Sequence, residues 1–131
     1  MPARPDGQVL ILVALALPVL VAFLALAADS GNFYLARRIS QNAADAGALA
    51  GAVELCIQDA TAAQIRASAE AYALCNGADR IAVEVGEVAV SVEVFTTRPT
   101  IFLGLAGMDH FEVGASATAG CDADAQVVLT R

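Results

Sequence analysis

The hydrophobic and polar positions divide the chain into an apolar amino-terminal run and a longer region of mixed periodicity. Residues 9–28, VLILVALALPVLVAFLALAA, are 20 residues without a charged, amide or hydroxyl side chain. A helix of that length rises about 30 Å, which matches the hydrocarbon thickness of a bilayer. Thirteen of the 20 are Val, Leu, Ile or Phe, and each favours membrane insertion by about 0.3–0.6 kcal/mol. We therefore predict a transmembrane helix here, with Pro18 tolerated inside it.

Two other interpretations of residues 9–28 remain open. Arg4 and Ala25-Leu26-Ala27 fit the basic start and the cleavage site of a secretory signal peptide, although the apolar core of such a peptide is usually about 7–15 residues long. A buried core helix would need a much larger domain around it. With the transmembrane interpretation, the chain divides into a short leader or cytoplasmic tail at 1–8, the span, and an extracytoplasmic domain at 29–131.

The segment after the span has helical periodicity. We expect a polar break at residues 29–32, at the membrane surface, and a helix over residues 33–57. On a wheel of about 100° per residue, one apolar stripe about 80° wide is expected to bury against the rest of the domain. It contains Ile39, Ala43, Ala46, Ala50, Val53 and Ile57. Beside it lies a face with no side chain larger than a hydroxymethyl group, formed by Ser40, Ala44, Gly47 and Gly51.

This small-residue face (Ser40, Ala44, Gly47 and Gly51) is a candidate helix-docking surface. Glycine costs a helix about 1 kcal/mol relative to alanine, so two glycines would be a poor choice on a face that met only water. Small residues spaced four apart allow another backbone to approach closely. Either a helix of a partner subunit docks on the face, or the second helix or the hairpin of the same chain packs there.

A second, shorter helix and a sheet are predicted after residue 60. Thr61 and Gln64 form a capping-box pattern, and Asn76-Gly77 offers a left-handed stop. Hydrophobic residues then alternate with polar or small ones over 81–94. The phase flips at Gly86-Glu87, which favours a two-residue hairpin, with a bulge in one longer strand as the alternative. Residues 111–119 predict a third strand, and residues 101–107 predict one or two helical turns that lie over the sheet. The fold class is α+β: the transmembrane helix is extended by a long helix and followed by a second, shorter helix and a three-stranded antiparallel sheet.

Charge and chemistry exclude several classes of function. From Asp29 onward the chain has six arginines and thirteen carboxylates, a net charge of −7, which argues against nucleic-acid binding and against a surface that lies on anionic lipid. His110 could complete a zinc site with the cysteines, but nothing in their spacing supports one. The chain has neither a nucleophile-elbow motif nor a phosphate-loop motif. We expect no enzyme activity, no cofactor, no metal and no small-molecule substrate.

Three cysteines bear on compartment and topology. They lack a C-x-x-C or metal spacing, which favours an oxidising compartment. The positive charges flanking the span are nearly balanced, so the cysteines decide the predicted orientation: amino terminus in the cytoplasm and domain outside. The candidate disulfide joins Cys56 to Cys75, and the alternative joins Cys75 to Cys121.

Two stretches of the chain resemble a known family. Residues 7–52 combine Gly-Gln before the span, a proline within it, Asp-x-Gly at its end and the block QNAADAGALAGA. They resemble the amino-terminal region of the TadE/TadG-like proteins of tight-adherence (Flp) pilus systems. Residues 98–120, RPTIFLGLAGMDHFEVGASATAG, are similar to the final helix-turn and strand of such proteins.

The resemblance implies a pilin-like, membrane-anchored minor or accessory component of a pilus or secretion machine, with other subunits of that machine as partners. Family members with a prepilin signal are cut after a glycine, which corresponds here to Gly7 before Gln8. They also carry a glutamate five residues past the cut, where this chain has Leu12. That departure favours an anchored accessory role over insertion into a filament. The alternative function is a secreted acidic domain, released by signal peptidase, that binds an extracellular partner.

Overall fold

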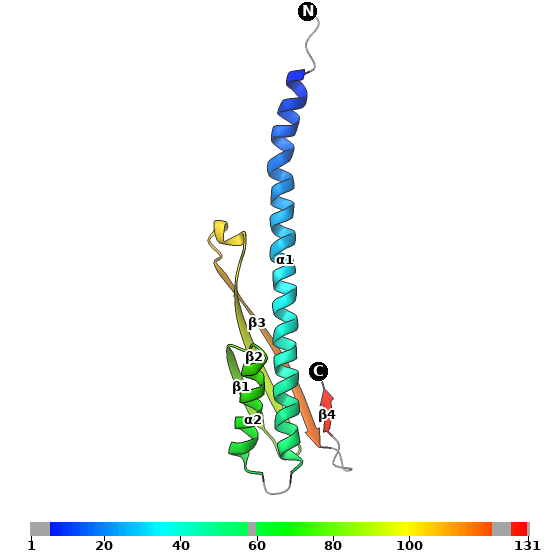
Figure 1. Cartoon of the computed structure of the whole chain (residues 1–131), viewed down its shortest axis with the longest axis vertical. Helices are drawn as coiled ribbons and strands as arrows, with labels where there is room; N and C mark the ends of the chain where they lie inside the picture. Colours follow the sequence, from blue (N-terminus) through cyan, green and yellow to red (C-terminus); the bar gives the residue numbers. More distant parts are fainter. Residues whose placement is uncertain (1–5, 58–59, 122–126, 131) are drawn as a thin grey trace, which may run out of the picture.

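The computed structural model describes residues 6–57, 60–121 and 127–130. Its longest element is one helix, α1 (Asp6–Leu55), which extends along most of the length of the molecule (Figure 1). The first half of α1 extends beyond the rest of the chain, and its second half lies along a second helix and a sheet. The helix continues through residues 29–32, so the extension of the span by a long helix is confirmed, whereas the expected interruption by the polar residues is wrong. The polar residues there cost helix propensity of about 1 kcal/mol or less each, whereas a break would require a second unfavourable nucleation.

The second helix, α2 (Ala62–Cys75), begins and ends where the sequence predicts. The Thr61 side chain accepts a hydrogen bond from the Gln64 N–H, and the Gln64 side chain accepts one from the Thr61 N–H at 2.9 Å. These two bonds satisfy backbone donors that the first turn leaves unpaired. At the other end Gly77 adopts a positive φ of 95°, a conformation that glycine reaches without a steric penalty.

The sheet has four antiparallel strands in sequential order rather than the three predicted. They are β1 (Arg80–Val85), β2 (Ala89–Pro99), β3 (His110–Cys121) and β4 (Val127–Thr130). β4 is a four-residue edge strand that pairs with the last part of β3, from Thr118↔Thr130 to Cys121↔Val127. A run this short carries almost no periodicity of its own, and its strand conformation depends on the β3 edge beside it.

A tight connection joins β1 to β2. Val85 pairs with Val90, and the Gly86 N–H donates to the Ala89 carbonyl at 2.8 Å. The flip in alternation at Gly86-Glu87 therefore marks a hairpin, and the alternative of a bulge in one long strand is wrong.

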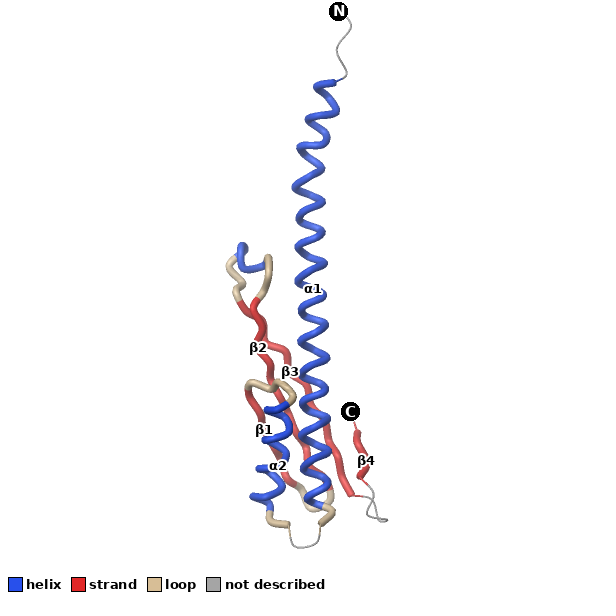
Figure 2. The backbone as a smooth tube through the Cα atoms, in the orientation of Figure 1, coloured by secondary structure: helices blue, strands red, loops and turns tan. Residues whose placement is uncertain are grey.

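One core lies between the helices and the sheet, and Figure 2 shows how the helices and strands that form it lie relative to one another. Alternate residues of β2 and β3 point into it, because successive side chains of a strand face opposite sides of a sheet. The sheet contributes Val90, Val92, Val94, Ala115, Ala117 and Ala119, and the helices contribute mainly alanines together with Ile65. Small helix side chains against valines allow the backbones of α1, α2 and the sheet to lie close together.

Candidate functional site

The first half of α1 carries the largest exposed apolar surface of the described chain. Its large hydrophobic side chains between Val9 and Leu26 are 51% to 74% exposed. Among the described residues, one helix is long and apolar enough to cross a membrane, and its most apolar window is not buried against any other part of the chain. Exposed hydrocarbon of this extent is unfavourable in water and favourable in lipid.

The end of this apolar run is held to a distant segment by Asp29. Its side chain is 5% exposed. The carboxylate accepts hydrogen bonds from the backbone N–H of Ile101 at 2.7 Å, of Leu103 at 2.8 Å and of Phe102 at 3.2 Å. We call residues 100–109, which connect β2 to β3, the hairpin tip. They include the short 3-10 helix η1 (Leu103–Ala106), which lies beyond the ends of β2 and β3 (Figure 1), so the prediction that these turns lie over the sheet is wrong.

The charge of Asp29 is stabilised by this arrangement. Burial disfavours the ionised form, but the three backbone hydrogen bonds outweigh it and hold the pKa of the carboxyl below its ordinary value. Two further contacts lie just beyond it: Asn32 Nδ2 donates to the Pro99 carbonyl at 2.8 Å, and the rings of Phe33 and Phe111 are 5.5 Å apart. This junction is not predicted by the sequence, in which its one local sign is an aspartate directly after the apolar run.

The small-residue face is covered by the chain itself. The Ser40 hydroxyl donates to the carbonyls of Ala36 and Val113, and Ala44 is buried. A Cβ placed on Gly47 would lie 3.0 Å from the Ala69 carbonyl oxygen of α2. A Cβ on Gly51 would lie 2.9 Å from Val90 Cγ1 of β2.

The prediction that a partner helix docks on this face is therefore corrected: α2 and the sheet occupy it, which was the intramolecular alternative. Glycine fits these two positions because a methyl group would force the neighbouring backbone or side chains to move.

The apolar stripe is correspondingly only partly buried. Ala43 is buried, but Val53 is 51% exposed and Ile57 is 54% exposed, so the prediction that the whole stripe is buried is wrong. Leu49 and Val53 line an open cavity between α1 and α2 together with Ser68 and Tyr72. The inner face of α1 is selected by close approach to two neighbours and not by side-chain hydrophobicity.

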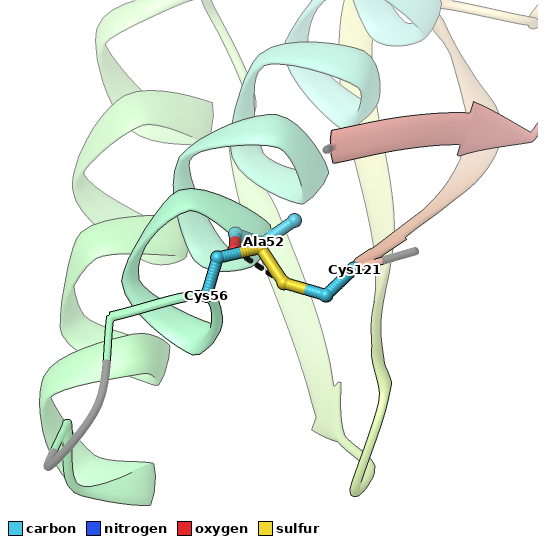
Figure 3. The surroundings of a disulfide bond; sticks show 3 residues. All are labelled: Ala52, Cys56 and Cys121. Atoms are coloured by element: carbon cyan, nitrogen blue, oxygen red, sulfur yellow. Dashed lines mark hydrogen bonds between the residues drawn. A yellow bond between two sulfur atoms is a disulfide. The ribbon is translucent and has the colours of Figure 1, made fainter. Parts of the chain in front are cut away.

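The cysteines pair differently from both predictions. Cys56, just after α1, is bonded to Cys121 at the end of β3, with Cα atoms 5.8 Å apart, whereas Cys75 is exposed and free (Figure 3). Neither Cys56–Cys75 nor Cys75–Cys121 is formed. The reason is the direction of α2: its 14 residues carry the chain about 20 Å along the domain, so Cys75 lies at the opposite end of that helix from its beginning near Cys56.

The chain matches one known family model, and the matched segment lies within α1. Residues 7–54 match the family model of Flp pilus-assembly TadE/G-like proteins. The chain is TadE/G-like over this segment. No curated protein and no solved structure gives a significant match to the chain.

The TadE/G-like segment nearly coincides with α1, which spans Asp6–Leu55. It contains the apolar run, Asp29 and the small-residue face. The sheet lies outside the match, so the likeness of residues 98–120 to the carboxy-terminal part of the family stays a prediction.

The predicted cleavage position lies at the beginning of the TadE/G-like segment. Gly7 and Gln8 are in the first turn of α1, and both are exposed. Residues 1–5 of the predicted leader lie outside the described residues. Cleavage between Gly7 and Gln8 stays a prediction.

Further chemistry is sparse in the part of the chain that the structure describes. His110 is exposed at the start of β3, and it is not gathered with the cysteines. The described residues contain no group of three or more His, Cys, Asp or Glu side chains placed to hold a metal ion. The TadE/G-like family is an assembly family and not an enzymatic one.

Proposed function

We propose that this TadE/G-like protein is a membrane-anchored, pseudopilin-like accessory component of a Tad/Flp-type pilus or a related secretion machine. The observation that carries the proposal is the division of α1 within the TadE/G-like segment. One half is an exposed apolar rod, and the other half is the central helix of a folded α+β domain. One continuous helix would couple a membrane anchor to a domain and set the distance of the domain from the membrane.

In this proposal residues 9–28 span the membrane, the amino terminus is cytoplasmic, and residues 29–131 form the extracytoplasmic domain. The Cys56–Cys121 bond supports this orientation, because disulfides persist in oxidising compartments and are rare in the bacterial and eukaryotic cytosol. Leu12, in place of the glutamate of filament-forming relatives, favours an anchored accessory role. The proposed partners are the membrane and other subunits of the machine.

Membrane fractionation tests the anchoring. The full chain should remain with membranes after a carbonate wash, and a reporter that fluoresces only in the cytoplasm should stay dark when fused after Arg131. A bright fusion would overturn the orientation. A shortened chain in the medium would overturn the anchor and support the alternative, a secreted acidic domain cut after Ala25-Leu26-Ala27.

A second experiment tests the assembly role. Deleting the gene for this protein in its source cell should abolish or reduce surface piliation or secretion. Expression of the full chain should restore the lost piliation or secretion. In a further variant, an unrelated transmembrane helix replaces residues 9–28. This variant keeps the domain at the membrane, so it tests whether the assembly role needs the native span or only a membrane anchor. Normal piliation in the deletion strain would contradict the proposed role.

A further inference from the structure

The hairpin tip, residues 100–109, exposes an unusual amount of hydrocarbon for a loop. Leu105 is 91% exposed, Ile101 58%, Met108 54% and Phe102 41%. No charged side chain occurs between Ile101 and Met108. Such a cluster is unfavourable in water and marks a surface that contacts a protein or a membrane.

The position of the hairpin tip indicates whether its apolar surface contacts a protein or a membrane. Asp29 holds the backbone of residues 101–103 at the end of the apolar run, through hydrogen bonds of 2.7 to 3.2 Å. From there the tip extends back along the helix, in the direction of the amino terminus. A groove between them is lined by Ala22, Ala25 and Leu26 of α1 and by Phe102, Leu103 and Leu105 of the tip. Figure 1 shows η1 beside α1, beyond the ends of β2 and β3.

The length of α1 beside which the hairpin tip lies gives the expected depth of the tip in a bilayer. Ala22 and Asp29 are seven residues apart on one helix, which corresponds to about 10 Å along its axis. If residues 9–28 span a bilayer, a segment packed beside residues 22–29 lies within the interfacial layer and the outermost hydrocarbon of the same leaflet. The exposed surface of the tip is continuous with Leu26 of the helix, which is 58% exposed and lines the same groove.

We propose that the hairpin tip inserts into the outer leaflet of the membrane beside α1, as a second membrane contact of the domain. The occupant of its apolar surface is lipid, because the tip shares a level and a continuous apolar surface with the span. The inference rests on the proposed anchoring of residues 9–28. The span of α1 and the hairpin tip, which Asp29 joins, would then both contact the membrane. Two such contacts would restrict tilting of the domain, which a single helix would permit.

Site-specific fluorescence in vesicles tests the insertion. The full chain is reconstituted into phosphatidylcholine vesicles with an environment-sensitive fluorophore at one position, and spin-labelled lipids serve as quenchers. Leu105→Cys in a Cys75→Ser background reports on the tip, and Leu20→Cys in the same background reports on the span. The native Cys75, exposed at the end of α2, is the matched aqueous position.

The Leu105 position should show a blue-shifted emission and a loss of fluorescence with quenchers near the headgroups. Leu20 should be quenched by labels deep in the acyl chains, and Cys75 by neither. Quenching at Leu20 without quenching at Leu105 overturns the insertion and leaves the anchor standing. Absence of quenching at both positions overturns the anchor itself.

Self-association is a further outcome. A blue shift at Leu105 that depends on protein concentration and is insensitive to spin-labelled lipid would show that the tip contacts a second copy of the chain, which contradicts the proposal. Mapping the Cys56–Cys121 bond in each labelled variant confirms that the domain has retained its structure.

Discussion

Asp29 connects the end of the apolar run to residues that follow it by 72 to 74 positions. Asp29→Asn keeps the shape of the side chain but removes its charge and one of its two acceptor oxygens. We expect faster hydrogen exchange at the amides of Ile101 and Leu103, with the core strands unchanged. Asp79→Asn is the matched control, because Asp79 also accepts a backbone N–H, from Thr97, but away from the tip. Unchanged exchange at the tip in Asp29→Asn would contradict the role of this carboxylate.

The same carboxylate predicts a pH dependence of the tip. The pKa of Asp29 is lowered in the folded chain relative to its ordinary value of 3.8. Its contribution to stability is therefore present above that ordinary value and is lost as the pH falls through the lower, folded pKa. Amide chemical shifts of residues 101–103 should be constant near neutral pH and should move together in strong acid. The transition should be absent in Asp29→Asn, and a transition that persists there would belong to another group.

We expect substitution by alanine to have different effects on the free energy of unfolding at two glycines of α1. A methyl group on Gly51 would meet Val90 Cγ1 at 2.9 Å, whereas one on Gly31 meets nothing within 4 Å. Overpacking costs about 1–3 kcal/mol, which exceeds the gain in helix propensity of about 1 kcal/mol. Gly51→Ala should lower the free energy of unfolding by up to about 2 kcal/mol, and Gly31→Ala should not lower it. Denaturation of both variants in the same detergent would decide, and equal stabilities would argue against the tight contact.

At the scale of elements, the disulfide closes the domain by joining the end of α1 to the end of β3. The bridged residues are 65 positions apart, and a loop of that size corresponds to roughly 4 kcal/mol of stabilisation in the chain-entropy treatment. The double substitution Cys56→Ser with Cys121→Ser should lower stability by several kcal/mol. Cys75→Ser, on the exposed end of α2, should leave it unchanged. Peptide mapping without reduction should recover Cys56 linked to Cys121, and recovery of Cys75 in a disulfide would contradict the structure.

For the whole molecule, the core and the apolar run of residues 9–28 are separate. The buried hydrophobic residues of α1 begin at Ala36, and they pack with α2 and the sheet. A chain that begins at Ala27 should therefore fold as a domain, since it retains Asp29 and every core residue. We expect a folded circular-dichroism spectrum and a cooperative thermal transition, with residual association through the exposed tip. Loss of that transition would show that the apolar half of α1 is needed for folding.

Features encoded by neighbouring residues could be predicted from the sequence. The apolar run of residues 9–28, the capping box at Thr61 and the alternation in β1, β2 and β3 each depend on spacings of a few positions. Such signals follow from the periods of helices and strands and from backbone capping, so they do not need the rest of the fold. They were sufficient for the fold class and for the resemblance to TadE/G-like proteins.

Features that join distant segments were decided only by the tertiary structure. Residues 33–57 present both an apolar stripe and a small-residue face, and the sequence does not rank hydrophobicity against close approach. The small-residue face is inside because α2 and β2 come within contact distance of Gly47 and Gly51. The partner of Cys56, the strand β4 and the hydrogen bonds of Asp29 are likewise set by which segments the fold brings together. Local periodicity determines the two helices and strands β1 to β3, whereas the mutual packing of these elements determines which faces meet and where β4 forms.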